Sequence, residues 1–142
     1  MTVTATAVHP YPKTLHPIHA TLLAGTVPLF LGALLSDLAY WSSYQVEWAN
    51  FASWLIAGGL VFSGLALLCA LAGLFRSRGG ERRPIYFLLL VAVWILGFIN
   101  ALVHARDAWA AMPTGLVLSI IVTLLAIAAT GVGLSRRVGV VA

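Results

Sequence analysis

The sequence predicts an all-α integral membrane protein, a four-helix bundle with up-down-up-down topology. Of its 142 residues, 61% are hydrophobic and only 8% are charged. Ordinary soluble domains carry roughly 25% charged residues, so this chain has too few charges to cover a surface that faces water. The charged residues lie in short clusters that separate four apolar segments, and each segment is long enough to cross a bilayer.

The first apolar segment predicts a helix over about residues 17–41. Pro17 suits the first helical position, where its missing N–H has no partner to lose, and His16 is then the N-cap. At a rise of about 1.5 Å per residue the helix is roughly 36 Å long, which is enough to span the hydrocarbon with some tilt. Pro28 falls near the middle and removes one backbone hydrogen bond, so a kink is expected there.

Three further helices are predicted over about residues 50–75, 84–105 and 113–134. Asn50 is expected to cap the second helix, and Pro84 and Pro113 to begin the third and fourth. Aromatic residues gather around the first link and mark a membrane interface: Tyr40, Trp41, Tyr44 and Trp48. The membrane domain is therefore residues 16–137, between a cytoplasmic tail of residues 1–15 and a C-terminal tail of residues 138–142.

Basic residues predict the orientation of these spans. One side of the membrane receives seven of the eight: Lys13, Arg76, Arg78, Arg82, Arg83, Arg136 and Arg137. Only Arg106 falls on the other side. By the positive-inside rule both termini are cytoplasmic in a multi-pass protein of a bacterial inner membrane. The net charge of +4 is thus interpreted as a topology signal, and nucleic acid is not an expected partner.

A polar cluster is predicted where the first and third helices reach the outer interface. Its members are Asp37, Asn100, His104, Arg106 and Asp107. Asp37 is expected to pair with His104 or Arg106, because such groups are costly in hydrocarbon without a partner. One interpretation is a structural clasp between the two helices. The other is a proton or cation pathway that uses Asp37 and His104, since histidine titrates near neutral pH.

Histidines at the start of the first helix suggest a cofactor site. His16 and His19 are three residues apart and His9 lies nearby, so the three can ligate a transition metal, and His16 and His19 can ligate haem iron. His104 is roughly 30 Å away by helix rise, so a haem held by two histidines of one chain is not expected. The structural alternative is that His16 caps the helix and His19 lies at headgroup level. Cys69 is the only cysteine, which excludes an intrachain disulfide and a cysteine-based metal cluster.

The order of these residues along the first helix resembles the bacterial membrane family catalogued as domain of unknown function 2231. The residues that carry the resemblance are His16-Pro17-Ile18-His19, Pro28, Gly32 and Asp37-Leu38. Many members have a proline after the second histidine, where this chain has Ala20. The resemblance implies a membrane redox setting, because the family's domain is sometimes joined to Rieske-type or cytochrome domains.

These observations predict a small non-enzymatic membrane protein, an accessory or anchoring subunit in an electron-transfer setting. It would bind haem or a metal through His16 and His19 and would contact a redox protein, as a homo-oligomer or as part of a larger complex. The alternatives are the proton or cation pathway and a purely structural oligomerising tetraspan. No nucleophile elbow, phosphate loop or zinc-protease motif is present in the sequence.

Overall fold

The computed structural model describes residues 16–76 and 83–135, and all regular structure in them is helical. The elements are α1 (Pro17–Ser43), α2 (Val46–Arg76), α3 (Arg83–His104), α4 (Ala108–Ala111) and α5 (Thr114–Ser135). By length and composition α1, α2, α3 and α5 can each cross a membrane. The predicted all-α class with four spanning helices is confirmed.

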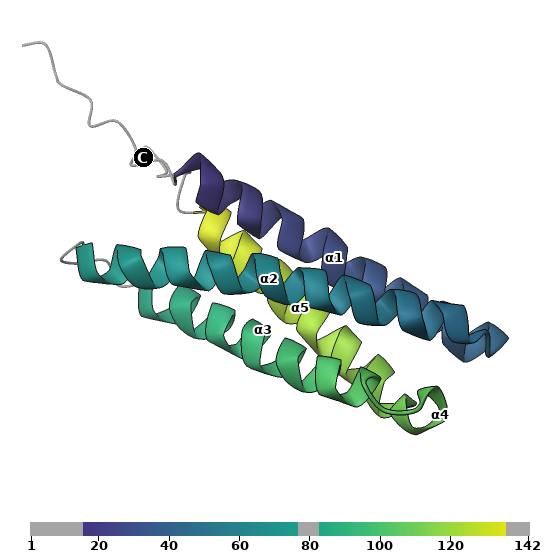
Figure 1. Ribbon diagram of the computed structural model, residues 1–142. Coiled ribbons are helices and arrows are strands. Elements are labelled where there is room, and N and C mark those ends of the chain that lie inside the picture. Colours follow the sequence, from purple (N-terminus) through teal and green to yellow (C-terminus); the bar gives the residue numbers. More distant parts are fainter. Residues whose placement is uncertain (1–15, 77–82, 136–142) are drawn as a thin grey trace, which may run out of the picture.

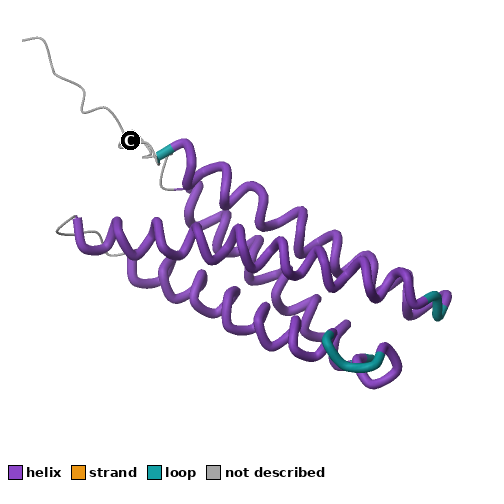
Figure 2. The backbone as a smooth tube through the Cα atoms, in the orientation of Figure 1, coloured by secondary structure: helices purple, strands orange, loops and turns teal. Residues whose placement is uncertain are grey.

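The four long helices run in alternating directions, and residues 16 and 135 lie at the same end of the bundle (Figure 1). α1 packs against α2 and α5, and α3 packs against the same two helices. α1 and α3 therefore face each other across the diagonal of the bundle. The tube view shows the α1–α2 turn and α4 together at the opposite end (Figure 2). We call this the outer end.

α1 begins at Pro17 with His16 at the N-cap, although the His16 side chain makes no capping hydrogen bond. The helix continues through Pro28 and ends at Tyr44, which adopts the left-handed conformation (φ 56°) and donates its N–H to the Tyr40 carbonyl. Because this residue reverses the chain at once, α2 begins at Val46, four residues earlier than expected. Asn50 therefore lies inside α2 and does not cap it.

The remaining boundaries differ less from the prediction. Predicted ranges 84–105 and 113–134 compare with Arg83–His104 and Thr114–Ser135. The short helix α4 was not anticipated, because four residues are too few to show a helical period.

Phe30 of α1 lies at the centre of an apolar core. A Cβ added at Gly59 of α2 would lie 2.8 Å from Cζ of the Phe30 ring, which no real side chain tolerates. A glycine at this position thus lets α2 approach α1 closely, as is usual where membrane helices pack. Leu23, Leu90 and Val122 are fully buried around the same core.

Candidate functional site

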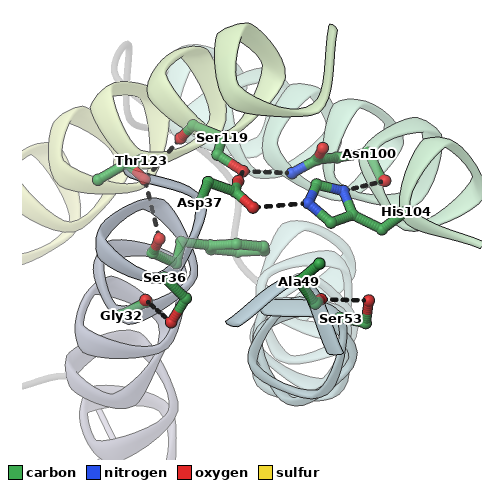
Figure 3. Close-up of polar contacts among 10 residues, drawn as sticks. Gly32, Ser36, Asp37, Ala49, Ser53, Asn100, His104, Ser119 and Thr123 are labelled. Atoms are coloured by element: carbon green, nitrogen blue, oxygen red, sulfur yellow. Dashed lines mark hydrogen bonds and ion pairs between the residues drawn. The ribbon is translucent and has the colours of Figure 1, made fainter. Parts of the chain in front are cut away.

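Asp37 is the one carboxylate that is buried within the described part of the chain, with no exposed surface. Its Oδ1 lies 2.8 Å from Nε2 of His104, at the end of α3. Its Oδ2 accepts a hydrogen bond of 2.5 Å from the hydroxyl of Ser119 on α5. Figure 3 shows the carboxylate between these two partners. Asp37 thus joins α1 to α3 through His104 and to α5 through Ser119.

The second nitrogen of His104 fixes the number of protons on the pair. Nδ1 lies 3.0 Å from the carbonyl oxygen of Asn100. A carbonyl oxygen can only accept, so Nδ1 carries a hydrogen. The contact between Nε2 and Asp37 then holds one further proton, as imidazolium with carboxylate or as imidazole with carboxylic acid. In both arrangements the pair has no net charge, which suits its burial.

Asn100 determines the direction of the hydrogen bonds. Its Nδ2 donates to Oγ of Ser119 at 2.9 Å, so the Ser119 hydroxyl is free to donate to Asp37. Among the described residues, Oδ1 of Asn100 is buried and has no hydrogen-bond partner. An unpaired buried acceptor costs about 1–3 kcal/mol. The Asn100 amide thus donates one hydrogen bond to Ser119 while its oxygen is left unpaired.

Thr123 lies one turn below Ser119 on α5 and extends the network. Its hydroxyl lies 2.7 Å from the Ser119 carbonyl and 3.1 Å from the Phe30 carbonyl of α1. The hydroxyl thus shares its hydrogen between its own helix and the neighbouring one. This contact holds α5 against α1 beside the Asp37 carboxylate.

The imidazole of His104 lies directly against the backbone of Gly115, near the start of α5. A Cβ added at Gly115 would lie 2.7 Å from Cε1 of His104. Only glycine leaves room for the ring in its observed position. Gly115 is thus part of the site, although it contributes no side chain.

The predicted polar cluster divides into two parts. Asp37, Asn100 and His104 come together inside the bundle, whereas Arg106 and Asp107 are exposed. α3 ends at His104, so the chain turns outward just before Arg106. The partner of Asp37 is His104 and not Arg106.

The two helix-one histidines lie in different environments. His19 is buried, and its Nε2 lies 2.7 Å from the hydroxyl of Tyr86 on α3. His16 is exposed at the start of α1, and His9 lies outside the described residues. In residues 16–76 and 83–135 there is no group of three or more His, Cys, Asp or Glu that can hold a metal ion. The predicted position of His19 at headgroup level stays a prediction, and inside the bundle the residue is buried against Tyr86.

Sequence reasoning did not assign Ser119 or Tyr86 to these contacts. Two signals pointed to them. Ser119 and Thr123 are hydroxyl residues four apart on an otherwise apolar helix, so they share one face. Tyr86 is separated from His19 by the same 67 residues that separate His104 from Asp37, so both pairs join the same two helices at one register.

The order of the side chains restricts the chemistry. Asp37 lies between Ser119 and His104, so no imidazole faces the Ser119 hydroxyl. A serine nucleophile of the Ser-His-Asp type needs an imidazole that faces its hydroxyl, whereas here the hydroxyl faces the Asp37 carboxylate. The arrangement can instead hold a proton between a carboxylate and an imidazole.

Fold and site together define a small multi-pass membrane protein with a buried polar network. The sequence model of the family described as predicted membrane protein (DUF2231) matches residues 15–141. The chain belongs to this family, as its first helix suggested. Comparisons with curated proteins and with solved structures gave no match.

Proposed function

We propose that this protein is a non-enzymatic, proton-responsive membrane protein in which Asp37 and His104 bind and release one proton. The observation that carries the proposal is the position of the two His104 nitrogens. Both face acceptors, at 2.8 Å and 3.0 Å, and the pair is buried between α1, α3 and α5. Such a pair is neutral only while it holds one shared proton.

A change in the number of protons affects the packing of the helices. Loss of the shared proton leaves a carboxylate that faces an imidazole lone pair, and the site becomes negative. Gain of another proton leaves a buried positive charge and weakens the bond between Asp37 and His104, because a neutral carboxyl group is a poorer acceptor than a carboxylate. Both states are costly in a low-dielectric interior. Protonation is therefore coupled to movement of α1 relative to α3 and α5.

A proton pathway through the whole bundle is less well supported. From Asp37 to His19 is 18 residues along α1, or about 27 Å. The space between them is filled by the apolar core around Phe30, Leu23 and Leu90. A conducting path usually needs polar lining or water. The features favour local exchange of a proton with one side of the membrane.

The cofactor hypothesis is also less well supported, because His19 already has a hydrogen-bond partner. For His16 and His19 to ligate haem or a metal, His19 would have to bind through Nδ1 or release the hydrogen bond of its Nε2 with Tyr86. The accessory redox role then depends on the family resemblance and on a partner protein. The absorption spectrum of the purified protein, with elemental analysis for metals, tests it. A Soret band or stoichiometric metal that is lost in His16→Ala would support the cofactor over the proton site.

The distribution of basic residues supports placing the Asp37 end on the outer side of a bacterial inner membrane. In that orientation the pair exchanges its proton with the extracytoplasmic face.

Infrared difference spectroscopy of the reconstituted protein, between about pH 5 and about pH 8, tests the proposal. We expect a carboxyl band that is absent in Asp37→Asn and retained in Asp107→Asn. Asp107 is the matched control, because it is an exposed carboxylate near the same end.

Nitrogen NMR of the His104 ring in the unmodified chain gives a second reading that requires no variant. We expect the Nε2 signal to change over the same pH range. An unchanged signal, together with a carboxyl band that persists in Asp37→Asn, would refute the proton site.

A further inference from the structure

The segment between α3 and α5 closes over the imidazole of His104. The segment begins after His104, the last residue of α3. It ends at Gly115, whose backbone lies against the His104 ring. α4 lies between these two points, and its Ala111 is buried. α4 therefore packs against α3 at the outer end of the bundle, between the two points at which the chain meets the imidazole (Figure 1).

Aromatic residues cover the carboxylate from α1. Tyr40 follows Asp37 by three residues on the same face, and it is only 3% exposed. Tyr44 comes one turn later, and the two rings meet edge to face at 6.4 Å between centroids. Asp37, Tyr40 and Tyr44 thus form a column that leads outward from the pair.

The segment that contains α4 and the aromatic residues of α1 meet where Tyr44 contacts Trp109. The rings of Tyr44 and Trp109 are stacked, with centroids 5.6 Å apart and planes inclined by 14°. Each residue is otherwise mostly exposed, at 60% and 73%. Tyr44 holds a left-handed backbone conformation that is uncommon outside glycine, asparagine and aspartate. The stack therefore joins the α1–α2 turn to α4 at a position where the backbone conformation is unfavourable.

We propose that α4 is a lid over the Asp37–His104 pair, and that the Tyr44–Trp109 stack is its latch. The lid governs how fast water and protons reach the pair. Three charged residues near the outer end are exposed around it: Glu47, Arg106 and Asp107. Opening of the latch frees α4 without breaking the long helices. The role of the lid in proton exchange rests on the proposed function, whereas its effect on access does not.

A small imidazole-acylating reagent, applied to the full chain in bilayer nanodiscs, tests the lid. Peptide mass spectrometry gives the modification rate of each histidine. In the wild type His16 should react fast, because it is exposed, whereas His104 and His19 should react slowly, because they are buried. In Trp109→Ala and Tyr44→Ala the His104 rate should rise on the order of 2- to 10-fold, which is the contribution of an aromatic pair to an opening equilibrium.

Three comparisons make the result specific. Trp109→Phe keeps an aromatic ring and should retain the wild-type rate. Trp54→Ala removes a comparably exposed tryptophan that has no such stack among the described contacts, and it should change nothing. His19 lies five helical turns from Asp37 and reports on the fold, because it should stay slow unless the bundle opens as a whole.

The outcomes separate the two proposals. An unchanged His104 rate in both alanine variants refutes the lid, whatever the infrared experiment gives. Equal acceleration of His104 and His19 also refutes it, since that result indicates global loosening. A faster His104 rate, together with an unchanged His104 Nε2 signal and no pH-dependent band from Asp37, supports the lid and refutes the proton site.

Discussion

Two polar contacts cross the diagonal between α1 and α3, one at each end of the bundle. The outer contact joins Asp37 to His104, and the inner one joins His19 to Tyr86. In each contact the two residues are 67 positions apart in the sequence. From His19 to Asp37 and from Tyr86 to His104 is the same 18 residues, or about 27 Å of helix. The two helices are therefore parallel and in register across the core.

The two contacts differ in chemistry. The outer one contains a carboxylate, and it is completed by Ser119 and Asn100. The inner one joins an imidazole to a phenol, two groups that are both neutral in their common forms. A buried carboxylate without its partner is far more costly than a buried neutral group without its hydrogen bond. Loss of a partner should therefore destabilise the outer contact more than the inner one, and three variants test this difference.

The largest effect is expected from His104→Leu, which leaves the buried Asp37 carboxylate without its imidazole partner. Breaking one side of a buried ion pair costs about 3–5 kcal/mol in the free energy of unfolding. The double variant Asp37→Leu with His104→Leu should recover much of this loss, because apolar pairs often replace buried ion pairs at little cost. Denaturation in mixed micelles, followed by circular dichroism, measures both. Equal stability of the single variant and the wild type would show that the outer contact carries no special energy.

An intermediate effect is expected from Gly115→Ala. The added Cβ would lie 2.7 Å from Cε1 of His104, so the ring must move away from Asp37. Overpacking of this kind costs about 1–3 kcal/mol. Gly131→Ala is the matched control on the same helix, because a Cβ there meets no atom within 4 Å. A loss of stability that is the same in both variants would point to the helix backbone and not to the His104 contact.

The smallest of the three effects is expected from Tyr86→Phe, which removes only the hydroxyl that bonds His19. Hydrogen bonds between membrane helices contribute about 0.6 kcal/mol on average, so the loss should be close to this value. The same denaturation assay applies. If Tyr86→Phe costs as much as His104→Leu, the inner contact is as strong as the outer one and the expected difference is refuted.

Parts of the site followed from the sequence because a charged residue in an apolar helix needs a partner. Asp37 had two candidates, His104 and Arg106, and the pattern of residues did not choose between them. His104 lies one helical turn after Asn100 on the same face of α3, whereas Arg106 lies beyond the end of that helix. Periodicity placed Ser119 on a face with Thr123 but did not assign its partner, because a serine hydroxyl on an apolar helix can equally bond its own backbone. The partner of Tyr86 depends on which helices are neighbours.

The sequence by itself determined the membrane environment, the four spans, the start of α1 at Pro17 and the family. These follow from composition and from local rules that act along the chain. Only the tertiary structure decided that α1 and α3 lie on a diagonal in register, that Asp37 takes His104, and that Gly115 makes room for the ring. These features depend on the distance between side chains on different helices, which no local pattern encodes.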